Sequence, residues 1–232
     1  MKGKLWGENP AVGIKRQFSA ISIIGQPTSR LNLFISPEFL MVYVRFQPGS
    51  LFKLLKIPMI ILLDQQIDAS DVLGSEINGV YEQMGECTSF DAMLQIVNNY
   101  FIKKFNQLKN DSRPIDVIGK HILQNPQAFN LEKTAKDACL SNRQFEKRFE
   151  QLTGVTPKYF ARICRFYEAY VLKESHLELD WLSVAVQTGY YDYQHLVKDF
   201  KTFAGTTPNI FIDQCTNNPT QTLARAIGFV GC

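Results

Sequence analysis

A pattern of helix, turn and helix occurs twice between residues 131 and 208, and this repeat constrains the fold more than any other feature. A shift of about 51 residues carries a set of core and stop positions of the first copy onto the second. The pairs are Phe145 and Leu196, Phe149 and Phe200, Gly154 and Gly205, Thr156 and Thr207, and Pro157 and Pro208. Ser141 falls on Asp192, and both are favourable N-cap residues. The chain is therefore predicted to contain two equivalent helical units.

Each unit is predicted to pack a short helix under a second helix. In the first unit, Leu131, Ala135 and Ala138 share one helical face, and small alanines let another helix cross closely. Ser141 and Gln144 have the spacing of a capping box at the start of the second helix. The second unit is expected to follow the same plan, with Leu182, Ala185 and Val186 inward, a turn at Gly189, then Leu196, Phe200 and Phe203.

The outward faces of both second helices carry long hydrogen-bonding side chains. At about 100° per residue, the positions opposite the buried aromatics are polar in both copies. Arginine and lysine can donate to guanine, and glutamine can pair with adenine, in a DNA major groove. An ordinary solvated helix face is the alternative for one helix, but two aligned copies favour DNA recognition. The candidate base-contacting residues are Asn142, Arg143, Glu146, Lys147, Tyr193, Gln194, His195 and Lys198.

Positive charge is concentrated locally rather than over the whole C-terminal half. Residues 111–215 hold 13 basic and 13 acidic side chains, whereas residues 143–165 hold six basic and two acidic ones. That local excess suits contacts to a few phosphates. The candidate DNA-backbone residues are Ser141, Arg148, Lys158, Arg162, Lys201 and Thr207. Arg165, on the expected joining helix, is assigned instead to positioning or an internal charge pair.

Residues 114–214 resemble the DNA-binding domain of the AraC/XylS family of bacterial transcription regulators. The resemblance rests on residues in both copies: Thr134, Ala135, Ser141, Phe145, Arg148, Phe149, Gly154, Pro157, Arg165, Ala169, Val184, Ala185, Gly189, Tyr190, His195, Leu196, Phe200, Lys201, Gly205, Thr207 and Pro208. It implies two helix-turn-helix units joined by a long helix at residues 157–174. It also implies recognition helices that enter successive major-groove segments on one face of DNA.

The first 110 residues differ from the C-terminal half in their pattern of apolar and β-branched residues. Residues 18–24 and 39–46 are rich in β-branched and aromatic side chains and are predicted to be strands. Residues 51–55 suggest a short helix, residues 71–84 another, and residues 89–108 a long one with an apolar stripe from Phe90 and Leu94 to Leu108. This part faintly resembles a domain that precedes the DNA-binding module in some relatives, with a shorter strand-forming opening here.

These patterns predict an α+β chain with three parts. Residues 1–110 form a small mixed α/β domain for sensing or association, incomplete relative to relatives. Residues 111–215 form an all-α domain with two helix-turn-helix units joined by a long helix, and residues 216–232 form a tail. The polar stretch 109–114 ends in Pro114, which suits a short linker before a helix. Residues 223–230 are expected either to dock or to stay loose.

Composition fits a cytoplasmic protein that needs no cofactor. The five cysteines are scattered and form no close metal-binding pair, and the N-terminus lacks the apolar core of a secretion signal. The apolar run 57–63 is far too short to span a bilayer. Double-stranded DNA is the expected partner, with RNA polymerase added if the protein is an activator. A small-molecule effector or a homodimer is expected to involve the N-terminal domain, and no membrane is expected.

Two other classes of function compete with a DNA-binding regulator. A protein-interaction module could keep the fold and lose DNA binding, and Glu146, Asp199 and the balanced charge are its support. An enzyme is the weaker alternative, because His121, His176 and His195 lie in unrelated contexts without a catalytic or nucleotide-binding motif. The sequence therefore favours a regulator that is not an enzyme, and leaves its operator, its effector and the sign of regulation open.

Overall fold

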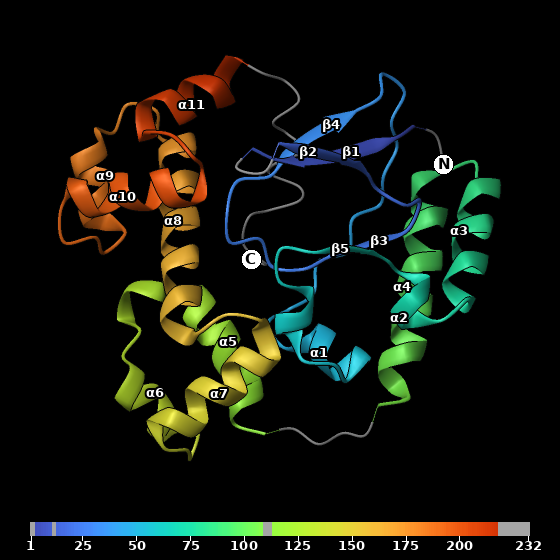
Figure 1. Cartoon of the computed structure of the whole chain (residues 1–232), viewed down its shortest axis with the longest axis horizontal. Helices are drawn as coiled ribbons and strands as arrows, with labels where there is room; N and C mark the ends of the chain where they lie inside the picture. Colours follow the sequence, from blue (N-terminus) through green and yellow to red (C-terminus); the bar gives the residue numbers. More distant parts are fainter. Residues whose placement is uncertain (1–2, 11–12, 109–112, 218–232) are drawn as a thin grey trace.

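The structure is a computed structural model that describes residues 3–10, 13–108 and 113–217. Within these residues, strands and helices mix in the N-terminal half, and the C-terminal half is helical (Figure 1). A long helix connects two helical units in that second half. The predicted α+β fold class is therefore confirmed.

The strands of the described chain form two small antiparallel sheets. One sheet has the order β2-β1-β4, and the other pairs β3 with β5. Their bounds are β1 Leu5–Asn9, β2 Ile14–Gln17, β3 Ser22–Ile24, β4 Asn32–Ile35 and β5 Gln66–Asp68. Trp6 on the central strand β1 lies opposite Gln17 on one side and Phe34 on the other.

The strand predictions for residues 18–24 and 39–46 were only partly right. Within the first range only Ser22–Ile24 is a strand. The Phe18 amide makes the last hydrogen bond to β1, at the Leu5 carbonyl, and the chain then bends, with the Ser22 hydroxyl donating to the Ser19 carbonyl, before it enters the second sheet. Residues 39–46 contain no strand at all, so that prediction was wrong. This segment has strand-like composition, but none of the described strands pairs with it, and its side chains line a cavity instead.

Helices cover the N-terminal sheets and mostly confirm the predicted positions. Their bounds are α1 Ser50–Leu55, the 3₁₀ helix η1 Met59–Leu62, α2 Ser70–Leu73, α3 Glu76–Glu86 and α4 Phe90–Asn106. The helix predicted at residues 71–84 is split into α2 and α3. Gly74, with a φ of 81°, provides the break, since a left-handed residue cannot continue a right-handed helix.

The long helix α4 begins as predicted, but its buried face is rotated. The Ala92 amide donates to the Ser89 hydroxyl across 3.2 Å, which caps the helix. Phe90 and Leu94, expected to face inward, are 68% and 54% exposed. Met93 and Tyr100 are buried instead. The buried face of α4 is therefore next to the predicted one, and the spacing of apolar residues alone did not distinguish the two faces.

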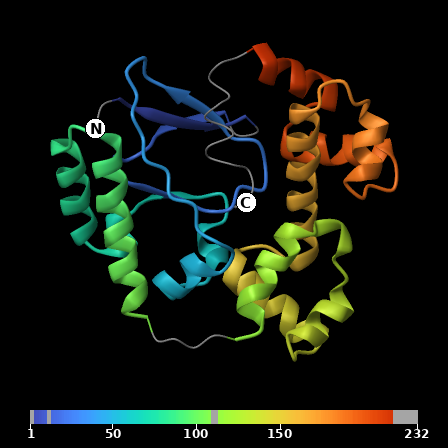
Figure 2. The ribbon, with the colours of Figure 1, turned by 180° about the vertical axis from the view of Figure 1, so that it is seen from behind.

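The C-terminal half places helices around the long helix α8 (Figures 1 and 2). The bounds are α5 Ile115–Gln124, the 3₁₀ helix η2 Pro126–Ala128, α6 Leu131–Asp137, α7 Asn142–Thr153, α8 Pro157–Ser175, α9 Trp181–Gln187, α10 Tyr193–Phe203 and α11 Pro208–Asn217. Helices α5 to α7 gather at one end of α8, and α9 to α11 gather at the other. The predicted joining helix at residues 157–174 is confirmed by α8.

Buried apolar side chains of the described residues form two clusters. The larger one draws its buried members from Ile115 to Ile212, entirely within the helical half. The smaller one surrounds Ile23, Leu62 and Tyr100 in the N-terminal half, and Phe52 packs against both clusters. Most of the proposed linker, residues 109–112, and the tail from residue 218 lie outside the described residues, as does the segment 223–230. The domain limits at 110 and 215 remain predictions.

Candidate nucleic-acid interface

The first helix-turn-helix unit consists of α6, a tight turn and α7. Ser141 caps α7 with a complete capping box, because its hydroxyl accepts from the Gln144 amide and the Gln144 side chain accepts from the Ser141 amide. Phe145 and Phe149 are fully buried under α7, and Ala135 lets α6 approach from below. Gly154 ends the helix at a φ of 86°. The sequence prediction for this unit is confirmed in detail.

The second unit, α9 to α10, repeats the first with one extra residue in its turn. Asn130 caps α6 and Asp180 caps α9, whereas Ser141 caps α7 and Asp192 caps α10. The sequence distance from Asn130 to Asp180 is one residue shorter than the distance from Ser141 to Asp192. The extra residue of the second unit therefore lies between α9 and α10. Tyr191 occupies this longer turn and is 88% exposed.

The extra residue explains an error in the predicted core of α9. Leu182 and Val186, expected to face inward, are 58% and 63% exposed. Trp181 and Val184 are buried in their place, beside Ala185 as predicted. The uniform shift was correct for α10 but one residue too long for α9, because an insertion in the turn changes the correspondence on its N-terminal side.

The candidate base-contacting side chains lie mainly on the exposed faces of α7 and α10. Asn142, Arg143 and Lys147 are exposed on α7, and Gln194, His195 and Lys198 are exposed on α10; Glu146 and Tyr193 are half-buried. Gln194 and Lys198 also line one open hollow with Lys201. Within the described chain, no carboxylate pairs with Arg143 or Lys147. These donors are available to an external acceptor.

His195 and Tyr191 form a small group at the start of α10. The His195 ring nitrogen lies 3.4 Å from the carboxylate of Asp192, the N-cap residue. The Tyr191 ring packs edge-on against the same imidazole, with 5.9 Å between ring centroids. His195 is one of the base-contacting candidates from the sequence, and Tyr191, which is not among them, lies exposed beside it.

The backbone-contact candidates fall into two structural groups. Arg148, Lys158 and Lys201 are exposed cations near the ends of the second helices or the start of α8. The Ser141 hydroxyl is already engaged in its capping box, and the Thr207 carbonyl accepts from the Phe211 amide. All of these assignments remain predictions.

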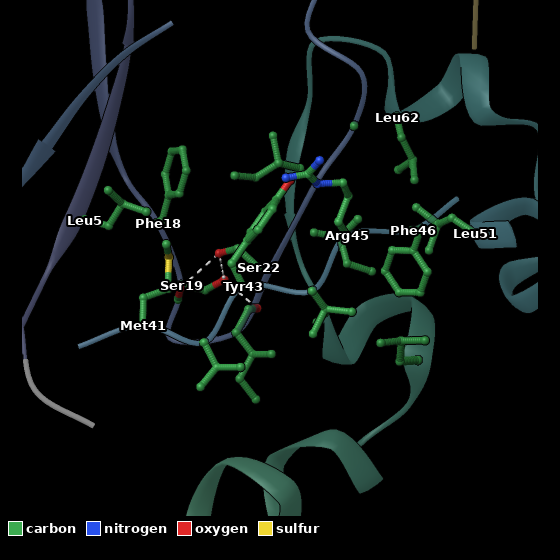
Figure 3. Close-up of a pocket in the computed structure, with 18 of the residues that line it drawn as sticks. Leu5, Phe18, Ser19, Ser22, Met41, Tyr43, Arg45, Phe46, Leu51 and Leu62 are labelled. Atoms are coloured by element: carbon green, nitrogen blue, oxygen red, sulfur yellow. Dashed lines mark hydrogen bonds between the residues drawn. The ribbon is translucent and has the colours of Figure 1, made fainter. Parts of the chain in front are cut away.

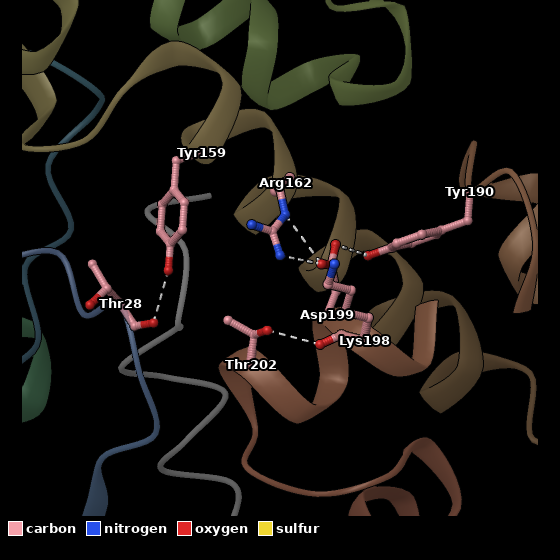
Figure 4. Close-up of polar contacts among 7 residues, drawn as sticks. All are labelled: Thr28, Tyr159, Arg162, Tyr190, Lys198, Asp199 and Thr202. Carbon is pink, nitrogen blue, oxygen red and sulfur yellow. Dashed lines mark hydrogen bonds and ion pairs between the residues drawn. The ribbon is translucent and has the colours of Figure 1, made fainter. Parts of the chain in front are cut away.

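Arg162, the remaining backbone candidate, lies in an internal network between α8 and α10 (Figure 4). Its guanidinium donates to the Asp199 carboxylate across 2.6 Å and stacks over the rings of Tyr159 and Phe203. The other carboxylate oxygen of Asp199 accepts from the Tyr190 hydroxyl across 3.2 Å. Burial and the neighbouring Asp199 charge raise the pKa of Tyr190 far above its usual range, so its proton stays in this bond.

Arg165 contributes to the same side of α8 through the turn of the second unit. Its guanidinium donates to the Gly189 carbonyl across 3.4 Å and lies over the Tyr190 ring. This placement agrees with the positioning role assigned from the sequence. The turn between α9 and α10 is thus held from α8 by an arginine, as α10 is held by Arg162.

The N-terminal half contacts both helix-turn-helix units near corresponding points of the repeat. The Tyr159 hydroxyl donates to the Thr28 carbonyl across 3.1 Å, at the start of α8 (Figure 4). Arg30 donates to the Ala204 carbonyl across 3.4 Å, at the end of α10. A side chain added at Gly154, at the end of α7, would come within 3.0 Å of the Met59 carbonyl oxygen. One region therefore touches the ends of both second helices.

A cavity of about 470 Å³ lies within the N-terminal half and reaches the helical half (Figure 3). Residues 39–46 and both small sheets supply much of its lining. Leu152, Thr153 and Phe160, from α7 and α8, also line it. The lining of the cavity therefore includes residues of the first helix-turn-helix unit as well as of the N-terminal sheets.

In the described part of the chain, no group of three or more histidine, cysteine, aspartate or glutamate side chains is arranged to hold a metal ion. Among the same residues, no helix combines the length and the apolar character needed to cross a membrane.

Comparison with known proteins matches the C-terminal half to a family described as a helix-turn-helix domain, over residues 134–214. A curated relative, an uncharacterized HTH-type transcriptional regulator of Haemophilus influenzae, is 32% identical over 90 residues. That alignment covers 38% of this chain and 30% of the relative, so the chain spans less than a third of the length of that protein.

Solved structures show similarity over the same region or over most of the chain. The DNA-binding domain of AdpA, solved in complex with a target DNA, is 25% identical, with a TM-score of 0.43 over 47% of this chain and 98% of that one. ToxT from Vibrio cholerae O395 is 14% identical, with a TM-score of 0.49 over 93% of this chain and 87% of that one. The family match and the repeated capping geometry both identify residues 134–214 as a helix-turn-helix domain.

Proposed function

We propose that this chain, in which residues 134–214 form a helix-turn-helix domain of the AraC type, is a sequence-specific DNA-binding transcription regulator. The observation that carries the proposal is the repetition of one capped helix with an exposed polar face, first as α7 and again as α10. A single such helix is common on protein surfaces, whereas two copies joined by α8 match what a pair of major-groove segments requires.

Each second helix is proposed to enter a major groove through its exposed face. Arg143 and Lys147 lie one turn apart on α7, and Gln194 and Lys198 lie one turn apart on α10. Their donors suit guanine O6 and N7 or the adenine edge. Asn142, Glu146, Tyr193 and His195 flank these positions and are proposed to contact bases beside them.

Phosphate contacts are proposed for the side chains around these two faces. Arg148, Lys158 and Lys201 are exposed cations that can hold the backbone without reading sequence. Ser141 and Thr207 are proposed to contact phosphates through the hydrogen-bonding groups that their local hydrogen bonds do not use. Arg162 is the weakest of these candidates, because its guanidinium already pairs with Asp199.

The N-terminal half is proposed to act as the regulatory part of the molecule. It contacts both helix-turn-helix units and contains the cavity, so an effector or a second subunit bound there can influence how the two units are held. If the regulator is an activator, RNA polymerase is its further partner. The Haemophilus relative, which is described as a transcriptional regulator, is consistent with this role.

A protein-interaction module that lost DNA binding is the second candidate. Its support from the sequence was the acidic pair Glu146 and Asp199, but Asp199 is buried against Arg162 and presents no charge to a polyanion. Glu146 alone remains on the face of α7. An enzyme has less support, because His121, His176 and His195 lie on separate elements without a shared site.

Binding of the full chain to duplex DNA as a function of salt tests the proposal. A library of random duplexes is selected first, and affinity for a selected site is then measured against ionic strength. The logarithm of affinity is expected to fall linearly with the logarithm of salt, by about 0.9 for each phosphate neutralised. Lys158→Ala is expected to reduce that slope by about one, uniformly across sequences.

Lys103→Ala is the matched control, because it also removes a lysine charge. Lys103 lies on α4, which sits on the far side of the molecule from α7 and α10, and pairs with Glu76 (Figure 1). Its slope is expected to equal that of the parent protein. Failure to select any sequence, with no salt dependence of duplex binding, would favour the protein-interaction module instead.

A further inference from the structure

The turn before α10 differs from the turn before α7 by one inserted residue, Tyr191. In the first turn, the Leu140 amide donates to the Ala135 carbonyl across 3.0 Å. In the second turn, the Tyr190 amide makes the same bond to the Ala185 carbonyl across 2.9 Å. Leu140 and Tyr190 are therefore equivalent, and Tyr191 is the residue that the first turn lacks. Tyr190 is buried, whereas Tyr191 is 88% exposed at the start of α10.

His195 occupies the position in α10 that Gln144 occupies in α7. The Gln144 side chain accepts from the Ser141 amide across 3.2 Å, which completes the capping box of α7. In α10 the Asp192 carboxylate forms the cap by accepting from the His195 amide across 2.8 Å. The first unit thus uses this side chain to close its own helix. The second unit leaves it at the surface, with the His195 side chain 60% exposed.

The two ring nitrogens of His195 lie in different surroundings. Nδ1 is 3.4 Å from the carboxylate of Asp192. The hydrogen bonds and ion pairs of the described residues do not engage the other nitrogen, Nε2. A carboxylate beside one ring nitrogen favours a proton on that nitrogen. Nδ1 therefore carries a proton in the neutral ring as well as in the charged one, and the proton that comes and goes with pH is the one on Nε2.

The ring of His195 is also held from its other side, because the Tyr191 ring packs edge-on against it with 5.9 Å between centroids. Helix α9, residues 181–187, contributes no charged side chain to this region. The titratable and charged side chains of the turn, of α10 and of the elements packed against them are Tyr190, Tyr191, Asp192, Tyr193, Lys198, Asp199, Lys201, Arg162 and Arg165 of α8, Asp213 of α11, and Arg30.

Of these side chains, Asp192 acts most directly on His195. The ion pairs of the described chain join His195 to Asp192, whereas Asp199 pairs with Arg162. Figure 4 shows that Asp199 also lies beside the Tyr190 hydroxyl, so its carboxylate belongs to the interior of the unit. The protonation of His195 is therefore governed from within the chain by the residue that caps its own helix.

A proton on Nε2 changes which base edge His195 can recognise. The charged imidazole donates from Nε2 and suits the O6 and N7 acceptors of guanine. The neutral imidazole, with its proton on Nδ1, accepts at Nε2 and suits the amino group of adenine or cytosine. His195 directly follows Gln194 and lies three residues before Lys198, at the flank of the face proposed to enter the groove.

We infer that His195 sets the base preference at one position of the second unit's DNA site and that this preference changes with pH. The charged imidazole selects guanine, and the neutral imidazole selects adenine or cytosine. Asp192 has a second role beside capping α10, because it keeps the Nδ1 proton in place and leaves Nε2 to read the base. The inference rests on the proposed function, since it needs α10 in a major groove.

The protonation state of the imidazole is tested first, without DNA. Long-range ¹⁵N–¹H correlation spectra of the full chain near pH 8 distinguish the two neutral forms of each histidine ring. The proton of His195 is expected on Nδ1. Asp192→Asn keeps a favourable N-cap residue and removes the charge, so it is expected to lose the preference for Nδ1. A parent spectrum with the proton on Nε2 would overturn the inference, whatever the chain does with DNA.

Base preference is then measured near pH 6 and near pH 8, which lie on either side of the usual titration of histidine. The DNA probes are single-base variants of a duplex selected by the full chain. At one position, the ratio of affinities for guanine and adenine is expected to fall about tenfold from the lower to the higher pH, because a charge-assisted hydrogen bond to guanine is lost. His195→Gln is expected to give the same ratio at both pH values.

His176→Gln is the matched control for the pH measurement. The Nδ1 atom of His176 also lies near a carboxylate, 3.2 Å from Glu178, and its side chain is similarly exposed. His176 follows α8 and is not part of either second helix. This variant is expected to keep the full change of base preference with pH.

The outcomes separate the inference from the proposed function. A parent chain that selects DNA but keeps one base preference at both pH values contradicts the inference and leaves the DNA-binding proposal intact. Equal behaviour of His195→Gln and His176→Gln has the same meaning. A chain that selects no sequence at either pH overturns the proposed function and the inference together.

Discussion

The guanidinium of Arg162 on α8 lies 2.6 Å from Oδ1 of Asp199 on α10, and this pair holds α10 against the joining helix α8. Asp199 is buried and also accepts from the Tyr190 hydroxyl at the turn before α10. One carboxylate therefore connects three parts of the second unit. The orientation of α10, and with it the direction of Gln194 and Lys198, depends on this contact.

Asp199→Ala is expected to lower the free energy of unfolding by about 1–3 kcal/mol, because the carboxylate loses two hydrogen bonds from Arg162 and one from Tyr190. Urea unfolding measures the change. Asp213→Ala, on the exposed face of α11, is the matched control and is expected to change stability by less than about 0.5 kcal/mol. Equal effects of the two substitutions would contradict the assigned role of Asp199.

The turns of the two units offer a second test, because equivalent positions hold different residues. Cys139 and Gly189 both have left-handed backbones, with φ values of 56° and 74°. Cys139→Gly is expected to raise the free energy of unfolding by up to about 1 kcal/mol, since glycine adopts this conformation without a side-chain clash. Cys139→Ala keeps the Cβ atom and is expected to bring no such gain.

Gly189→Ala is expected to destabilise the protein by about 1–3 kcal/mol. Besides the backbone conformation, a Cβ atom there would come within 2.4 Å of Cβ of Gln127, so a neighbour must move. Chemical denaturation of the variants gives the sign at each position. A stabilising effect of Gly189→Ala would contradict the need for glycine in the left-handed position of the second turn.

Residues 111–215 are expected to fold alone and to bind duplex DNA without the N-terminal half. The buried members of the larger core all come from this half, and only partly buried side chains such as Phe52 and Leu63 join it from outside. Circular dichroism and duplex affinity of the fragment check both statements. An unfolded fragment would mean that the contacts of Thr28 and Arg30 are part of the domain rather than an addition to it.

Glu168 on α8 gives a prediction for the pH dependence of stability. Burial raises the pKa of Glu168 above its ordinary value of 4.5, against the opposing charge of Arg165, and one of its oxygens is buried without a hydrogen-bond partner among the described residues. A carboxyl with a raised pKa in the folded state favours folding at low pH. Its ionisation costs stability as the pH rises from the ordinary value through the raised one.

Glu168→Gln is accordingly expected to raise the melting temperature at pH 7, because glutamine carries no charge to bury. The gain should disappear near pH 4, where the parent side chain is also neutral. Melting curves of both proteins from pH 4 to pH 8 provide the comparison. A difference that is constant with pH would assign the effect to packing rather than to ionisation.

The sequence predicted the helix-turn-helix units well because their signals are local. Ser141, Gln144 and Gly154 determine where α7 begins and ends, and the buried phenylalanines determine its inner face. The inner face of α9 was predicted wrongly, since the extra residue in the second turn is visible only when the two caps are compared separately. A uniform repeat length hides such an insertion.

Features that depend on contacts between distant residues were not predictable from pattern. The pairing of Arg162 with Asp199 joins residues from two helices, and nothing in the local sequence distinguishes Arg162 from an exposed phosphate-binding arginine. Residues 39–46 have the composition of a strand, yet they pair with none of the described strands and line a cavity. In both cases the sequence gives the type of side chain but does not identify the residues that it contacts.

The base preferences of three single variants of the protein, measured on a complete set of single-base variants of a selected DNA site at fixed salt, test the central claim most directly. Arg143→Ala is expected to cost about 1–3 kcal/mol at one base position and to flatten discrimination there, with Lys147→Ala acting on a neighbouring base. Gln194→Ala is expected to act about one helical turn of DNA, roughly 10 base pairs, away. Uniform loss of affinity for every site variant, with discrimination unchanged, would contradict direct base recognition by the two helices.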